Sequence, residues 1–108
     1  MVSFILRLKP NPESRQDLLA ILNSMRGPLN VRQNCLACEL YETQEDDNNI
    51  LYLEQWSNKE ALYDHIRSDL YLKILMVMEM VVEEPNIYIS EIASTQGMEL
   101  IQKLRGCE

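Results

Sequence analysis

A strand passes directly into a helix in the middle of the chain, and this junction constrains the fold more than any other feature. The apolar run Ile50–Trp56 has the length and composition of a strand. Ser57 follows it, and Glu60 lies three residues further on, which is the spacing of a capping box at a helix start. The predicted helix carries His65, the only histidine, and the strand carries Trp56, the only tryptophan. We therefore expect any pocket to lie at this junction.

Hydrophobic periodicity predicts four strands and two main helical regions. Predicted strands alternate apolar and polar residues, whereas predicted helices repeat apolar residues every three or four positions. In chain order, the predicted elements are a strand over Val2–Leu8, a helix from Asn11 to a stop at Arg26-Gly27-Pro28, strands over Cys35–Thr43 and Ile50–Trp56, helical pieces over Asn58–Arg67 and Asp69–Val82, and a strand over Asn86–Ile92. Polar residues Asp46–Asn49 predict a hairpin turn. The tail carries a short helical pattern through Met98, Ile101 and Leu104.

The order strand-helix-strand-strand-helix-strand is the split βαβ, ferredoxin-like pattern of the α+β class. It predicts a four-stranded antiparallel sheet with both helical regions on one face, in a domain over residues 1–94, followed by a tail over residues 95–108. Both sheet faces carry large apolar side chains: Leu51 and Leu53 point one way on the third strand, and Tyr52 and Trp56 point the other way. We therefore expect a second copy to cover the open face, in a homodimer that packs through the sheet faces.

The acidic balance of the chain limits its partners. The 108 residues carry a formal net charge of −7, which argues against binding to nucleic acid or to anionic membranes. No apolar run approaches the roughly 18 residues of a membrane span. The first apolar run also lacks the preceding basic region of a signal peptide. The expected location is the cytoplasm.

The three cysteines, Cys35, Cys38 and Cys107, are expected to be free thiols in a chain without a secretion signal. Cys35 and Cys38 form a CxxC motif, but it lies in a predicted strand rather than at a helix N-terminus, where a redox thiol would be activated. Residues three apart on a strand point to opposite faces. We therefore expect two packed thiols, with no disulfide and no metal site.

The motif E-x-W-x-x-x-E-A-L-x-x-H resembles that of the antibiotic biosynthesis monooxygenase family. It consists of Glu54, Trp56, Glu60, Ala61, Leu62 and His65. The segments LKPNPESRQDLLAIL and CLACELYE are also similar to that family, so the resemblance covers about residues 2 to 94. The resemblance implies a dimeric α+β barrel. It also implies a cofactor-independent oxygenase of quinols or aromatic polyketides, or a related haem-degrading enzyme.

Several positions depart from these relatives. The polyketide oxygenases combine the strand Trp with an Asn four residues earlier and a Tyr six residues later. Trp56 matches, but Tyr52 and Leu62 occupy the other two positions. The haem-degrading relatives carry Trp at the position of His65 and His at the position of Leu75. The sequence therefore does not support haem binding, and we expect no cofactor.

His65, Trp56 and Tyr52 are the candidate catalytic residues. Histidine has an unperturbed pKa near neutrality, so His65 is the natural base for a phenol or hydroquinone. Trp56 could stack on an aromatic ligand, and Tyr52 shares its strand face. Two of them also have a structural alternative, because Trp56 could be the largest block of the core and His65 could pack at a helix–sheet contact.

Glu54, Arg7 and Met78 are the candidate substrate-binding residues. A buried Glu54 would need a partner, and Arg7 on the first strand is the expected one. Burial could alternatively raise the pKa of Glu54 and make it a base. Met78 belongs to a methionine-rich segment that could line a soft pocket or simply fill the core.

Two functions remain open. One is a cofactor-independent monooxygenase that oxidises a quinol-like or polycyclic aromatic molecule with O₂, and it requires Tyr52, Trp56 and His65 to line one enclosed cavity. The other is a catalytically silent dimeric domain that binds or senses a small molecule, in which these side chains pack together without room for a ring.

Overall fold

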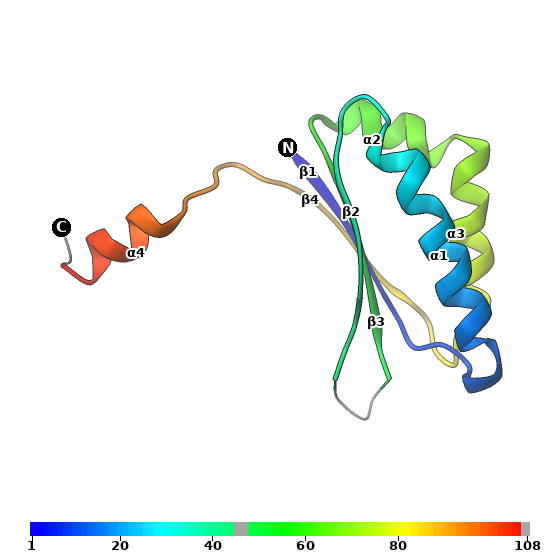
Figure 1. Ribbon diagram of the computed structural model, residues 1–108. Coiled ribbons are helices and arrows are strands. Elements are labelled where there is room, and N and C mark those ends of the chain that lie inside the picture. The colour runs from blue at the N-terminus through cyan, green and yellow to red at the C-terminus, as the bar shows by residue number, and fades with distance from the viewer. Residues whose placement is uncertain (45–47, 107–108) are drawn as a thin grey trace.

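Four strands form one antiparallel sheet in the computed structural model, which describes residues 1–44 and 48–106 (Figure 1). The strands are β1 (Val2–Leu8), β2 (Cys35–Glu42), β3 (Ile50–Trp56) and β4 (Asn86–Glu91). They lie in the order β2-β3-β1-β4, so the first and third strands are central. This topology confirms the predicted ferredoxin-like α+β fold.

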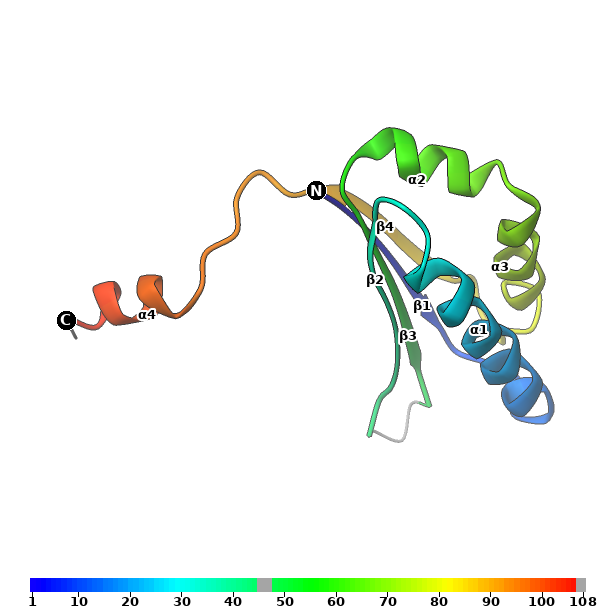
Figure 2. The ribbon, with the colours of Figure 1, turned by 45° about the horizontal axis from the view of Figure 1, so that its top comes forward.

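The helices of the domain all cover the same face of the sheet (Figures 1 and 2). They are α1 (Arg15–Asn30), α2 (Lys59–Ile66) and α3 (Leu72–Val77), with single 3-10 turns over Pro12–Ser14 and Asp69–Tyr71. A last helix, α4 (Met98–Leu104), follows the sheet and stands apart from the other three. None of the described helices has both the length and the apolar character needed to cross a membrane.

The strand register decides which side chains enter the core. On β1, Phe4 lies opposite Glu54 and Leu6 lies opposite Tyr52 of β3. Because opposed residues share a face, the even-numbered residues of both strands point towards the helices. The buried apolar core consists of Val2, Phe4, Leu6, Leu8, Leu18, Leu22, Met25, Leu29, Cys38, Ile50, Tyr52, Trp56, Leu62, Tyr71, Ile74 and Val77. The predicted division between Leu51 and Leu53 on one face and Tyr52 and Trp56 on the other is therefore confirmed.

The opposite face of the sheet has no helix of the described chain over it (Figure 1). Its centre is apolar, because Ile5 lies between Leu53 of β3 and Tyr88 of β4. Tyr88 is exposed, and Ile5 and Leu53 are half-buried. We refer to this surface as the open face.

Three predicted helix boundaries are wrong: the end of α1, the first residue of α2 and the end of α3. In each case a tertiary contact or a different capping residue decides where the helix begins or ends. Helix α1 runs through Gly27 and Pro28 to Asn30, and its last turn is anchored by the fully buried Leu29. Ser57 is not the cap of α2, because the Asn58 side chain accepts the Ala61 amide at 2.8 Å.

The helical region predicted to continue to Val82 ends at Val77. The chain is pulled across to the end of β1, where Pro10 and Val81 form a β-bridge and the Val82 amide donates to the Lys9 carbonyl at 2.9 Å. The predicted turn over Asp46–Asn49 lies partly outside the described residues. On its two flanks, the Thr43 amide donates to the Asn49 carbonyl at 3.1 Å.

Candidate functional site

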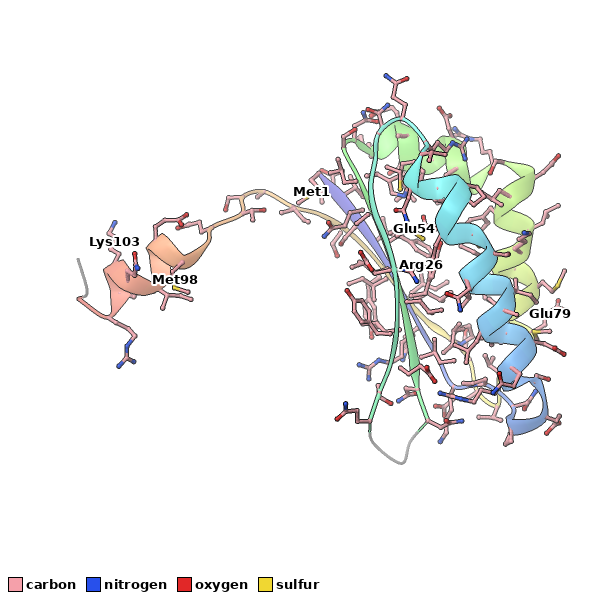
Figure 3. The ribbon with its side chains drawn as sticks, viewed as in Figure 1. Met1, Arg26, Glu54, Glu79, Met98 and Lys103 are labelled. Carbon is pink, nitrogen blue, oxygen red and sulfur yellow. The ribbon has the colours of Figure 1, made fainter. Side chains whose placement is uncertain are left out.

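Glu54 lies between the sheet and the helices (Figure 3), and its buried carboxylate is the centre of a hydrogen-bond network. Its Oε2 atom accepts a hydrogen bond from the Tyr52 hydroxyl at 2.5 Å and lies 3.0 Å from Nε2 of His65. Its Oε1 atom accepts from the Trp56 indole N–H at 3.0 Å. Strand alternation presents Tyr52, Glu54 and Trp56 on one face of β3, and α2 brings His65 onto them. We call these four residues the Glu54 network.

The imidazole of His65 is fully buried and held between aromatic rings. It stacks on the Trp56 ring, with centroids 5.1 Å apart and planes inclined by 29°, and meets the Tyr71 ring edge-on at 5.5 Å. A carboxylate only accepts hydrogen bonds, so Nε2 is the nitrogen that donates to Glu54. Among the described residues, the buried Nδ1 atom has no hydrogen-bond partner. This leaves a buried nitrogen lone pair available, in the same way as a carboxylate-oriented histidine base.

Burial keeps the hydroxyl and thiol groups around Glu54 protonated. Burial and the negative charge of Glu54 raise the pKa of Tyr52 well above its usual range, which agrees with its role as a donor. Burial likewise raises the pKa of Cys38 to about 11, and its thiol lies 3.4 Å from the Tyr52 hydroxyl. Burial raises the pKa of Cys35 as well. Neither thiol is therefore an activated nucleophile at neutral pH.

The two cysteines of the CxxC motif lie on the same face of the sheet, and the expectation of opposite faces is wrong. The register of β2 shifts between Cys35 and Ala37, so that Cys35 lies opposite Trp56 and Cys38 lies opposite Glu54. An inserted residue of this kind interrupts the alternation of side chains. Both thiols are free, and the described residues contain no cluster of three metal-ligating side chains.

Arg7 is not the partner of Glu54. It lies opposite Leu51 in the register, so its side chain is on the open face and exposed, whereas Glu54 points into the core. Met78 directly follows α3 and packs half-buried against the core. The predicted shared strand face of Tyr52, Glu54 and Trp56 is thus confirmed, whereas the predicted partner of Glu54 is wrong. Hydrogen-bonding capacity was the available signal, since Tyr52, Trp56 and His65 can all donate.

A surface hollow of about 360 Å³ lies against the network at Trp56. Its lining residues are Arg32, Gln33, Asn34, Trp56, Asn58, Glu60, Ala61 and Asp64. Tyr52 and His65 do not line it, because their side chains pack against Glu54 and Trp56 behind it. A second hollow, of about 260 Å³, lies at the same end of β3 beside Ser57 and Asn58. The three catalytic candidates thus pack against one another and do not line the one enclosed cavity that the monooxygenase was expected to require; an open hollow adjoins them at Trp56.

The family model "Antibiotic biosynthesis monooxygenase" matches residues 1–75, which include the whole Glu54 network. The chain belongs to the antibiotic biosynthesis monooxygenase family. Within that family it is 32% identical over 71 residues to "Putative monooxygenase Rv0793" of Mycobacterium tuberculosis, an alignment that covers 66% of this chain and 69% of that protein. It is 26% identical over 92 residues to the Synechocystis sp. protein sll1783, covering 84% of this chain but only 63% of that relative.

Solved structures of this antibiotic biosynthesis monooxygenase fold superimpose closely on the chain. The structure of Rv0793 gives a TM-score of 0.79 at 26% identity, covering 89% of this chain and 98% of its own. The crystal structure of an antibiotic biosynthesis monooxygenase gives 0.76 at 17% identity, covering 87% of this chain and 100% of its own. The family-model match confirms the family expected from the sequence motif, and these structures confirm the fold.

Proposed function

We propose that the protein is a cofactor-independent monooxygenase that oxidises a quinol-like or polycyclic aromatic molecule with O₂, and that His65 is its base. The observation that supports this function best is the buried Glu54–His65 pair, in which one nitrogen is held by the carboxylate and the other is unpartnered. Membership of the family and the monooxygenase name of Rv0793 support the same reaction class. We place the activity in the cytoplasm, where Cys35 and Cys38 stay reduced.

The base withdraws a proton and the substrate supplies the electrons. Nδ1 of His65 takes the phenolic proton, and Glu54 offsets the charge of the imidazolium that forms. The resulting phenolate transfers one electron to O₂, and the two radicals recombine at an electron-rich ring carbon. The peroxide anion takes the proton back from the His65 imidazolium and then loses water, so that a ring C–H group, the phenol O–H group and O₂ become two carbonyl groups and H₂O. These steps require water to be excluded from the radical pair.

The hollow beside Trp56 is the proposed substrate site. Its volume of about 360 Å³ lies within the range of small-molecule pockets. Trp56 is the one member of the Glu54 network that lines the hollow, and its ring stacks on the His65 imidazole. In this proposal, access of the substrate to the imidazole requires the Trp56 side chain to rotate, because the indole now stacks on that ring.

We further propose that two copies pack through their open faces. Ile5, Leu53 and Tyr88 form the apolar centre of that face, and a monomer would leave it in contact with water. An interface of standard size buries about 800 Å² per partner. The twofold dimer places one Glu54 network in each copy, on the helix side of each sheet.

Oxygen uptake with a panel of hydroquinones and anthrone-like phenols tests the activity. The parent is expected to consume O₂ with at least one of them, and His65→Gln is expected to lose at least about 100-fold in rate, which is the usual contribution of a general base. The matched control is Glu79→Gln, an exposed side chain after α3 that is expected to leave the rate unchanged. Unchanged uptake in a folded His65→Gln variant would remove the catalytic role. Ligand binding without any O₂ uptake in the parent would support the silent binding domain instead.

A further inference from the structure

The chain continues past β4 as an arm that leaves the domain. Residues 92–97 are extended, and α4 follows them on the side of the sheet away from α1, α2 and α3 (Figures 1 and 2). Figure 3 shows Met98 and Lys103 of this arm clear of the body that contains Glu54. The radius of gyration is 16.1 Å, against about 13 Å for a compact chain of this length. The arm is therefore extended away from its own domain.

Helix α4 is amphipathic. At 100° per residue, its apolar residues occupy one side of the helix and its polar residues the other. The apolar side consists of Met98, Leu100, Ile101 and Leu104, and the polar side of Glu99, Gln102 and Lys103. Met98, Ile101 and Leu104 are exposed by 63%, 53% and 76%. Within the described chain, α4 packs closely against no other helix or strand.

A helix of this length is not stable alone in water, because helices shorter than about 12 residues lack the hydrogen bonds to offset nucleation. The seven residues of α4 therefore need a surface that covers their apolar side. The body offers matching apolar side chains that are about half exposed. These are Leu72, Leu75 and Met76 on α3 and Ile87 and Ile89 on β4.

We propose that α4 of each copy docks its apolar side on the body of a second copy, so that the two arms are exchanged across the dimer. The exchange rests on the open-face homodimer proposed above. The arm leaves the domain on the open-face side, where the second copy is expected. Its six extended residues reach about 20 Å, whereas stacked sheets lie about 10 Å apart. The arm is thus long enough to pass the sheet of the second copy.

The charge distribution favours a second copy over an anionic membrane. Fifteen acidic and eight basic residues lie in residues 1–91, so this part carries the whole net charge of −7. The remaining residues are neutral overall and include Lys103 and Arg105. An acidic body repels anionic lipid, whereas a neutral arm with basic residues near its end meets no repulsion from an acidic body.

Matched substitutions on the two sides of α4 test the docking. The dimer dissociation constant is measured by sedimentation equilibrium for the full chain and for Ile101→Asp, Gln102→Asp and Leu53→Asp. Ile101→Asp buries a charge on the apolar side and is expected to weaken the dimer at least about tenfold. Gln102→Asp places the same charge on the polar side and is expected to change the dimer dissociation constant less than about twofold. Equal dissociation constants for Ile101→Asp and the parent would overturn the exchange.

The Leu53→Asp variant separates this inference from the dimer on which it rests. The new charge on the open face is expected to weaken the dimer. If Leu53→Asp dimerises like the parent, the sheet-face interface is wrong, and the comparison of Ile101→Asp with Gln102→Asp still reports on the docking of α4. A photo-crosslinking residue at position 98, in a mixture of light and ¹⁵N-labelled chains, then identifies the target of the arm. Cross-links that join a light arm peptide to a heavy body peptide are expected. Cross-links confined to single chains, or a monomeric parent, would contradict the exchange.

Discussion

Replacement of Glu54 by Gln perturbs the site while keeping its shape. The carboxylate accepts from three groups, Tyr52 and His65 at Oε2 and Trp56 at Oε1. An amide has one accepting end and one donating end, so it cannot satisfy all three donors in place. If the oxygen stays with Tyr52 and His65, the amide NH₂ faces the indole N–H, and both of these buried donor groups are left without an acceptor. If the amide is reversed, the His65 proton must move to Nδ1, which has no acceptor among the described residues.

The expected cost follows from this hydrogen-bond count. One unsatisfied buried donor costs about 1–3 kcal/mol, so Glu54→Gln should lower the free energy of unfolding by at least that amount. Glu54→Ala removes the acceptor of three buried donors and, at about 1–3 kcal/mol for each, should cost at least about 3 kcal/mol. Urea unfolding followed by tryptophan fluorescence measures both, with the exposed Glu79→Gln as control. A Glu54→Gln variant as stable as the control would refute the network as drawn.

Two further predictions concern the helix start and the buried thiol. Asn58→Ala should lower the free energy of unfolding by about 1 kcal/mol through loss of the cap on Ala61, whereas Ser57→Ala should cost less; equal losses in urea unfolding would contradict the observed cap. The pKa of Cys38 rises from 9.0 to about 11 on folding, so its neutral thiol stabilises the fold fully below pH 9.0 and this contribution is lost as the pH rises to about 11. Between pH 9 and 11, the stability of Cys38→Ser should therefore fall less steeply with pH than that of the parent. Urea midpoints measured over this pH range test this, and equal slopes for the two proteins would contradict the raised pKa of Cys38.

The β3–α2 junction was the part of the site that the sequence predicted best. Alternation alone places Tyr52, Glu54 and Trp56 on one face, and helical spacing brings His65 over them. The partner of Glu54 was not predictable in this way. Arg7 lies on β1, the strand next to β3, but its side chain points to the open face, whereas Glu54 points into the core. The choice between Arg7 and the three buried donors depends on strand pairing, which is a non-local property.

Local signals failed where tertiary packing or an irregularity overrode them. Gly27 and Pro28 signal a helix stop, yet burial of Leu29 carries α1 through them. The CxxC motif was placed on two faces because a bulge leaves no clear mark in a single sequence, and the register shift before Ala37 returns both thiols to one face. The predicted order of strands and helices along the chain is nevertheless correct, because it depends on the pattern of whole elements rather than on any one boundary.

The protonation of His65 tests the site most directly, because it is the only histidine in the chain and its imidazole signals need no assignment. Long-range ¹H–¹⁵N correlation spectra of the ¹⁵N-histidine-labelled protein near neutral pH distinguish a protonated ring nitrogen from a bare one. The Glu54 network requires a proton on Nε2, bonded to the carboxylate, and a lone pair on Nδ1. A proton on Nδ1 would contradict both the orientation of the imidazole by Glu54 and its role as a base.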